Sequence, residues 1–225
     1  MKHPLSRVLL ATATAMLVIS PVVALDADWF GGLRLSGGDR NYLSITAAHF
    51  GSDQREAEGL ARRLNRPGED LPVLLFLAAE SGRSSRQILD LRLSGLSWWE
   101  IRARLGVAPG RIVVALPQDP GPPYGKAWGH YRNQKKGPKS RRQVVLSDAE
   151  FSDWIGARVV SRAFDVEMAV VLRSRAGGQS LGDMVAQQER NRATTKSTAG
   201  RAHPGNGKAK GENRGGAGKG AKDGH

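Results

Sequence analysis

The chain has 225 residues, with 34 lysines and arginines against 21 aspartates and glutamates, so its formal net charge is +13 and its isoelectric point is near 10.7. It contains no cysteine, which excludes a disulfide scaffold, a thiol nucleophile and any zinc or iron–sulfur site with cysteine ligands. Hydrophobic residues make up 40% and aromatic residues 6% of the chain, so we expect one domain with a modest core and disordered parts.

The positive charge is concentrated in two segments. Residues 117–143 hold seven cations and one acid, and residues 190–225 hold nine cations and two acids. The blocks 25–116 and 144–189 together are close to neutral, with 16 cations and 18 acids. A high isoelectric point is typical of proteins that bind nucleic acids or anionic surfaces. The distribution places any such binding in the two basic segments rather than in a basic folded domain.

Residues 1–24 have the pattern of a signal peptide. Lys2 and Arg7 form a cationic start, and the stretch Val8–Ala24 carries no charge. We expect cleavage after Ala24, with Ala27 as the alternative. An uncleaved anchor is the other interpretation, although this uncharged stretch is short for a spanning helix. The predicted location is therefore the periplasm or the outside of a bacterium.

The spacing of apolar residues predicts an all-α fold, in which a helical body (25–116) and a C-terminal helical unit (144–189) form a compact bundle. Residues 117–143 are rich in Pro, Gly and cations and are predicted to form a disordered linker. Residues 190–225 contain nine glycines and no large apolar residue, so a disordered basic tail is expected. The helices are predicted at residues 42–50, 53–64, 71–80, 84–93, 97–105, 109–116, 148–162, 165–175 and 180–189.

Polar residues at the starts of these segments favour the same helices. Asp53, Ser84, Asp165 and Ser180 are predicted N-caps, and Ser97 with Glu100 has the spacing of a capping box.

The helical blocks resemble one another at fixed offsets. At an offset of 31, residues 49–51 align with residues 80–82, and Ala57 aligns with Ile88. At an offset of 83, residues 88–92 align with 171–175, and residues 95–101 align with 178–184. We interpret this as about three short helical repeats in which neighbouring units share a helix, because one such unit cannot bury its apolar face alone. Chance similarity among amphipathic helices is the alternative.

Residues 95–116, GLSWWEIRARLGVAPGRIVVAL, resemble a bacterial helix-turn-helix. A DNA-reading second helix needs several polar side chains that reach the bases. Here only Arg111 is suited to such a contact, because the residues that follow it are apolar. We therefore interpret the segment as a packing unit of the repeat, with DNA binding through Arg111 as the alternative.

Residues 124–136 combine aromatic and cationic side chains, which is a pattern of anion, sugar or single-stranded nucleic-acid binding. The alternative is a connector whose aromatic rings lie on the body. The candidate binding residues are Tyr124, Lys126, Trp128, Tyr131, Arg132, Lys135 and Lys136.

Trp98 and Trp99 are adjacent on a predicted helix and so point about 100° apart. We expect Trp98 in the core. Trp99 is a candidate for lining a surface groove, with simple partial burial as the alternative.

No catalytic, metal or cofactor motif is recognised in a suitable context. The sequence therefore predicts no catalytic residue, no metal ligand and no cofactor.

The segments Ala78–Ile101 and Tyr124–Tyr131, together with the leader and the Gly/Lys-rich tail, resemble uncharacterised secreted bacterial helical-repeat proteins. The resemblance implies an architecture and no activity. The leading hypothesis is an exported, non-enzymatic module that contacts an anionic partner through its linker and tail. That partner is an envelope polymer, lipid headgroups, extracellular nucleic acid or another protein. A helix-turn-helix protein and an enzyme with an unrecognised groove are the alternatives.

Overall fold

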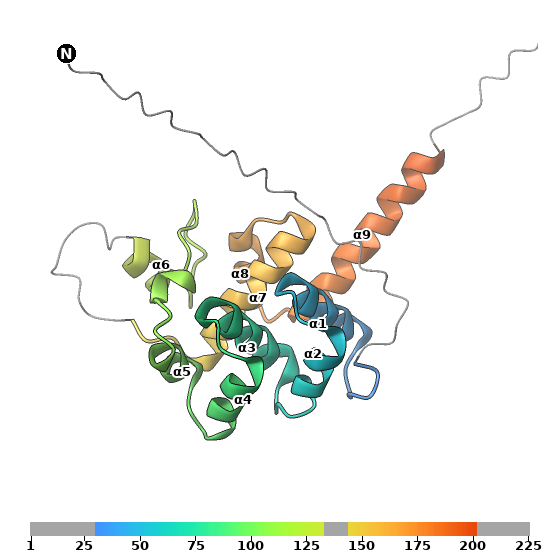
Figure 1. The fold of residues 1–225 in the computed structure, drawn as a ribbon. Helices are drawn as coiled ribbons and strands as arrows, with labels where there is room; N and C mark the ends of the chain where they lie inside the picture. The colour runs from blue at the N-terminus through green and yellow to red at the C-terminus, as the bar shows by residue number, and fades with distance from the viewer. Residues whose placement is uncertain (1–29, 133–143, 202–225) are drawn as a thin grey trace, which may run out of the picture. The chain divides into compact units, whose positions relative to one another are not determined.

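The computed structural model describes residues 30–132 and 144–201 (Figure 1), and within these ranges the chain is all-α with no strand, as predicted. The predicted leader, residues 133–143 and residues 202–225 lie outside the described residues. The helices are α1 (Gly37–His49), α2 (Gln54–Ala61), α3 (Pro67–Ser81), α4 (Ser85–Leu93), α5 (Trp98–Arg104), the 3-10 turn η1 (Pro109–Arg111), α6 (Gly125–Arg132), α7 (Asp148–Phe164), α8 (Met168–Ala176) and α9 (Leu181–Arg201).

Side-chain caps decide where most of these helices begin. The Asp53 carboxylate accepts hydrogen bonds from the first turn of α2, and Ser97 with Glu100 forms a complete capping box at α5, both as predicted. The prediction for Asp165 is wrong. This residue ends α7 in the left-handed conformation, with a φ of 57°, and does not cap α8. Asparagine and aspartate tolerate this conformation better than most residues, which is why an aspartate can stand where a glycine is usual.

The core is built around α3 and α7. The α3 segment Leu71–Leu77 is buried all round, which explains why its sequence is almost entirely apolar. α3 packs against α1, α2, α4 and α7, and α7 also contacts α1, α5 and α8. The rings of Phe76 and Phe151 meet edge to face with centroids 6.5 Å apart, which joins the two central helices.

Helices α3–α5 and the helices from α7 to the start of α9 follow one plan at the offset of 83. The starts of α4 and α8, at Ser85 and Met168, are separated by this offset, and so are the starts of α5 and α9. Gly95 and Gly178, which precede α5 and α9, both have a φ of 89°. The turns after α3 and α7 also correspond, since Gly82 and Asp165 are both left-handed. The offset predicted from sequence therefore relates helices that have the same order and the same turns.

The first turn of α9 packs closely against the first turn of α1. A Cβ atom on Gly182 would overlap the Asp39 carboxylate and lie 2.7 Å from the Asp39 backbone nitrogen. A Cβ on Gly38 would in turn overlap the Gly182 carbonyl. Position 182 aligns with Trp99 at the offset of 83. A glycine at this position therefore allows α1 to approach α9 where the equivalent position of α5 carries a large indole.

The C-terminal end of α9 belongs to a second unit, which begins at Glu189. The sequence predicts disorder from residue 190 onward, but residues 190–201 continue the helix, and the side chains of residues 190–195 are exposed. Residues 190–199 contain neither Gly nor Pro, so a helix already nucleated at its start can extend through them.

Two predictions between α5 and α7 are also wrong. Residues 109–116 do not form a helix, because η1 stops at Arg111. The Arg158 side chain donates hydrogen bonds to the carbonyls of Arg111 and Ile112, which a continuing helix would have used for its own backbone. Residues 117–132 do not form a disordered linker, because they contain α6, which packs on the body.

Candidate functional site

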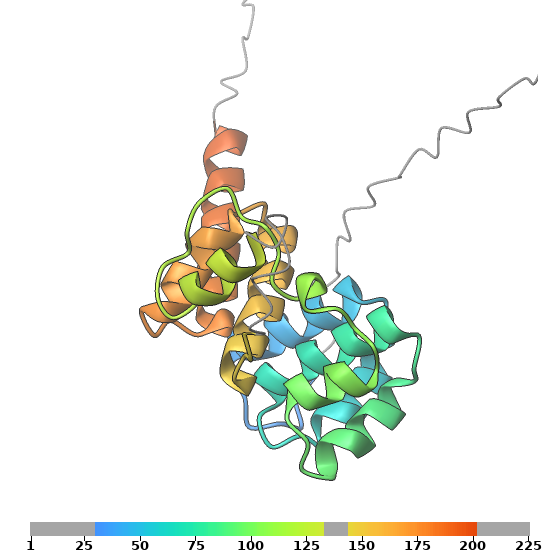
Figure 2. The same cartoon turned by 90° about the vertical axis from the view of Figure 1, so that its left-hand side faces the viewer.

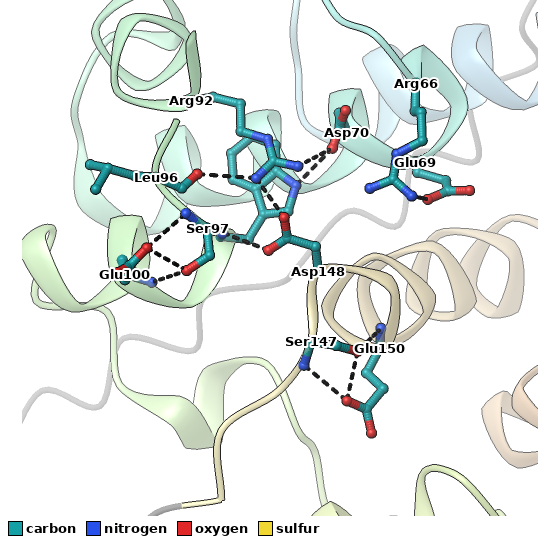
Figure 3. A network of polar contacts seen from close by, with 11 residues as sticks. Arg66, Glu69, Asp70, Arg92, Leu96, Ser97, Glu100, Ser147, Asp148 and Glu150 are labelled. Atoms are coloured by element: carbon teal, nitrogen blue, oxygen red, sulfur yellow. Dashed lines mark hydrogen bonds and ion pairs between the residues drawn. The ribbon is translucent and has the colours of Figure 1, made fainter. Parts of the chain in front are cut away.

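The first polar cluster centres on Arg92 at the end of α4. Its guanidinium donates to the carboxylates of Asp148 at 2.5 Å and Asp70 at 3.2 Å, and to the Leu96 carbonyl at 3.1 Å. Figure 3 shows Arg92 lying between Asp70 on α3 and Asp148 on α7. The Trp98 indole donates to Asp70 at 2.8 Å, and the guanidinium carbon lies 4.6 Å from the centre of the indole ring. We call these residues the Arg92 cluster; they tie α3, α4, α5 and α7 together.

This cluster is largely shielded from solvent. Its side chains are 17% exposed at Arg92, 4% at Asp70 and 25% at Asp148. Asp148 also accepts the backbone N–H of Trp98 at 2.8 Å, so it caps the start of α5 from the neighbouring helix. Because the guanidinium bonds to both carboxylates, the cluster stabilises the packing of these four helices against one another.

The second polar cluster repeats part of this arrangement at the offset of 83, with one carboxylate and one carbonyl on the arginine. Arg175 donates to the Asp153 carboxylate at 2.8 Å and to the Gln179 carbonyl at 2.9 Å. These three residues align with Asp70, Arg92 and Leu96. The alignment at the offset of 83 pairs Arg92 with Arg175 in the sequence, but Asp70 and Asp153 were not predicted to bond to these arginines. The same offset was the available signal, because an aspartate stands 22 positions before each arginine.

The second cluster differs in the second side-chain donor to its aspartate. Trp98 aligns with Leu181, which has no side-chain donor, and the Tyr124 hydroxyl instead donates to Asp153 at 2.6 Å. We call Asp153, Arg175, Tyr124 and the Gln179 carbonyl the Arg175 cluster. Burial and the bond to Asp153 raise the pKa of Tyr124, so its hydroxyl remains a donor at neutral pH. Burial lowers the pKa of Arg175, but the bond to Asp153 and its charge outweigh that effect and raise it overall.

Helix α6 is held on the body by one apolar face. Tyr124 and Ala127 are 1% exposed, and Trp128 and Tyr131 are partly buried against the same core. The Trp128 indole donates to the Leu116 carbonyl, and the Tyr131 hydroxyl donates to the Val144 carbonyl, both at 3.2 Å. Figure 2 shows α6 on the side of the body formed by α7 and α8. The spacing of these residues, at 124, 127, 128 and 131, is helical and was the signal that the Pro/Gly composition obscured.

The structure therefore separates the aromatic candidates from the cationic ones. Tyr124 is buried, so its ring offers no face to a ligand, and the expectation for this residue is wrong. Lys126 is exposed on α6. Arg132 is the last residue of α6, and its side chain lies outside the described residues, as do Lys135 and Lys136.

Trp99 does not line a groove. It is 7% exposed, its ring meets Phe151 edge to face at 6.3 Å, and the Arg102 guanidinium covers it at 4.2 Å. Both adjacent tryptophans are buried because α5 lies between α4 and α7, and because each indole is covered by an arginine.

Arg111 is held in an ion pair rather than on a recognition helix. Its guanidinium makes two bonds to the Glu80 carboxylate, at 2.6 and 2.8 Å, and these raise its pKa. Since residues 109–116 contain only a short 3-10 turn, the resemblance to a helix-turn-helix does not extend to its second helix.

Arg158 and Arg162 of α7 lie near His49 at the end of α1. The Arg158 guanidinium carbon lies 5.1 Å from the Phe76 ring centre. Burial, followed by the charges of Arg158 and Arg162, lowers the pKa of His49, so this histidine is neutral at pH 7.

Comparison of the chain with models of protein families, with curated proteins and with solved structures finds no match. Within residues 30–132 and 144–201, no group of three or more His, Asp or Glu side chains is placed to hold a metal ion. None of the helices in these same ranges is both long enough and apolar enough to span a bilayer.

Proposed function

We propose that the protein is an exported, non-enzymatic module that binds anionic polymers or surfaces through the basic residues 126–143 and 190–225. The helical body would serve as the rigid holder of these segments. The partner we favour is a ligand with closely spaced negative charges, such as an envelope polymer, an anionic lipid surface or extracellular nucleic acid.

The observation that carries this proposal is the separation of charge from core. Residues 126–143 contain seven cations and no acid, whereas the blocks 25–116 and 144–189 are close to neutral. In the body, the largely shielded guanidinium groups of Arg92 and Arg175 bond to internal carboxylates and carbonyls. A segment with closely spaced cations and no acid can neutralise an external anion.

The packing of α6 also indicates how such binding would work. Because Tyr124, Trp128 and Tyr131 contact the body, the segment would bind by charge rather than by stacking on bases or sugars. We therefore expect little discrimination between anionic ligands of equal charge density and a strong dependence on salt.

Salt-dependent binding of the full chain tests this proposal. Heparin, single-stranded DNA and vesicles containing phosphatidylglycerol are titrated at several salt concentrations. One variant ends at residue 201, and a second carries Gln in place of Arg132, Lys135, Lys136 and Lys139. For DNA, the removal of each cation that neutralises a phosphate should reduce the slope of log K against log salt by about 0.7.

A matched control replaces four exposed arginines of the body, Arg55, Arg83, Arg86 and Arg104, with Gln. This variant loses the same charge but should keep nearly all of the affinity. Equal losses of affinity in this control and in the variant with Gln at 132, 135, 136 and 139 would refute the proposal. Unchanged binding in both that variant and the chain that ends at residue 201 would refute it as well. Export is tested separately by fusing residues 1–30 to a reporter, which should leave the cytoplasm.

A further inference from the structure

In each polar cluster two side-chain donors bond to the aspartate carboxylate, but the second donor comes from a different part of the chain. In the Arg92 cluster, Arg92 and the Trp98 indole both donate to Oδ1 of Asp70, and the indole belongs to the first residue of the next helix in the unit. In the Arg175 cluster, the equivalent first residue is Leu181 of α9. Its side chain is seated over Gly156, where a Cβ atom would overlap it.

Without a further donor, the second oxygen of Asp153 would lack a partner. The Asp153 side chain is only 13% exposed, so water does not readily replace a missing donor. The Tyr124 hydroxyl bonds to this second oxygen at 2.6 Å, while Arg175 bonds to the first at 2.8 Å. The residue that satisfies the cluster is therefore supplied from the segment between the two helical units.

The position of Tyr124 gives this bond a second consequence. It directly precedes the first residue of α6, and Lys126 begins the acid-free basic stretch two positions later. The Tyr124 ring also packs edge to face on Trp154 of α7, with centroids 6.3 Å apart. One side chain thus fixes the start of the basic stretch to the central helix of the body.

We infer that Tyr124 is a positioning residue that supplies the second donor of the Arg175 cluster, on the carboxylate oxygen not bonded to Arg175, and thereby anchors α6, where the basic stretch begins, to the body. Its effect on binding rests on the proposed function, whereas the anchoring itself does not. The inference predicts that the Arg175 cluster controls the docking of α6 and that the Arg92 cluster does not.

Hydrogen exchange of the full chain tests the anchoring. In Tyr124→Phe, which keeps the ring, amides of residues 125–132 should exchange roughly 10- to 100-fold faster, as expected for losing a bond to a charged acceptor. Trp98→Phe removes the equivalent donor from the Arg92 cluster and should leave α6 exchange within about twofold of the parent. Tyr131→Phe removes a neutral bond from the same helix and should accelerate exchange by less than about tenfold.

Exchange in α6 that stays within about twofold of the parent in Tyr124→Phe would overturn the anchor. Equal acceleration by Trp98→Phe would overturn it as well, because it would indicate general loosening of the body. If Tyr124→Phe accelerates hydrogen exchange equally in every helix, the variant Asp153→Asn tests whether α6 depends on this carboxylate. It should loosen α6 while keeping an acceptor for Arg175, and protection of α6 in that variant would refute the inference.

Heparin affinity of the same variants separates the anchor from the proposed function. Tyr124→Phe should weaken heparin binding several-fold with an unchanged salt slope, since the cations remain but α6 is no longer fixed to the body. No heparin binding by the parent chain would refute the proposed function and leave the exchange result standing. Faster α6 exchange with unchanged heparin affinity would refute the positioning role.

Discussion

Replacement of Arg92 by alanine is the sharpest test of how the body is held together. The substitution removes a guanidinium that bonds to two carboxylates and covers an indole, and it deprives the Asp70 carboxylate, which is only 4% exposed, of its ion pair. Breaking a fully buried ion pair costs about 3–5 kcal/mol. Because Arg92 is 17% and Asp148 is 25% exposed, solvent screens part of this interaction. We therefore expect Arg92→Ala to lower the free energy of unfolding by about 2–4 kcal/mol.

Urea denaturation at pH 7, followed by far-ultraviolet circular dichroism, measures this loss. Arg63→Ala is the matched control, since its pair with Asp90 spans 3.6 Å and both side chains are about half exposed or more. The control should change stability by less than about 0.5 kcal/mol. Arg92→Lys should fall between the two, because it keeps the charge but loses the planar fork that reaches both acids.

The explanation would be refuted if Arg92→Ala were no more destabilising than Arg63→Ala. A double-mutant cycle with Asp148→Asn provides a second check. It should give a coupling free energy of about 1–2 kcal/mol, since the two groups are in direct contact.

Four other predictions concern single side chains. Gly182→Ala should destabilise the protein by about 1–3 kcal/mol in urea denaturation, because its methyl group would collide with Asp39. Gly59→Ala in α2 meets no atom within 4 Å and should be neutral or stabilising by up to about 1 kcal/mol. Leu77→Ala should cost about 2–5 kcal/mol, since Leu77 is fully buried. Because the pKa of His49 is lower in the folded chain, the unfolded chain binds a proton first as the pH is lowered below 6.5. The free energy of unfolding should therefore decrease as the pH is lowered, and His49→Gln should reduce this dependence on pH. An unchanged dependence would contradict the lowered pKa.

Most helices of this protein are predictable because their ends carry local signals. Asp53 and the Ser97–Glu100 pair specify helix starts through contacts within the first turn, and α3 is revealed by its uninterrupted apolar run. The repeat offset is also visible in sequence, because equivalent turns and core positions keep their order.

The candidate site was less predictable because its contacts are long-range. The Tyr124–Asp153 bond spans 29 residues and the Arg92–Asp148 bond spans 56, so neither follows from local pattern. Residues 109–116 look helical, yet the Arg158 side chain takes the carbonyls that a helix would need. In each case a tertiary partner overrides what the local sequence favours.

The contact between Gly38 and Gly182 has a consequence for how this architecture can change. In an open solenoid, each unit leaves an edge on which another copy can be stacked, so the array grows by duplication at its end. Here the first turn of α1 packs so closely on the start of α9 that neither Gly38 nor Gly182 has space for a Cβ atom. An additional copy placed after residue 188 would find that surface already covered. New material is more easily accommodated in the connections between existing helices, which is where α6 lies.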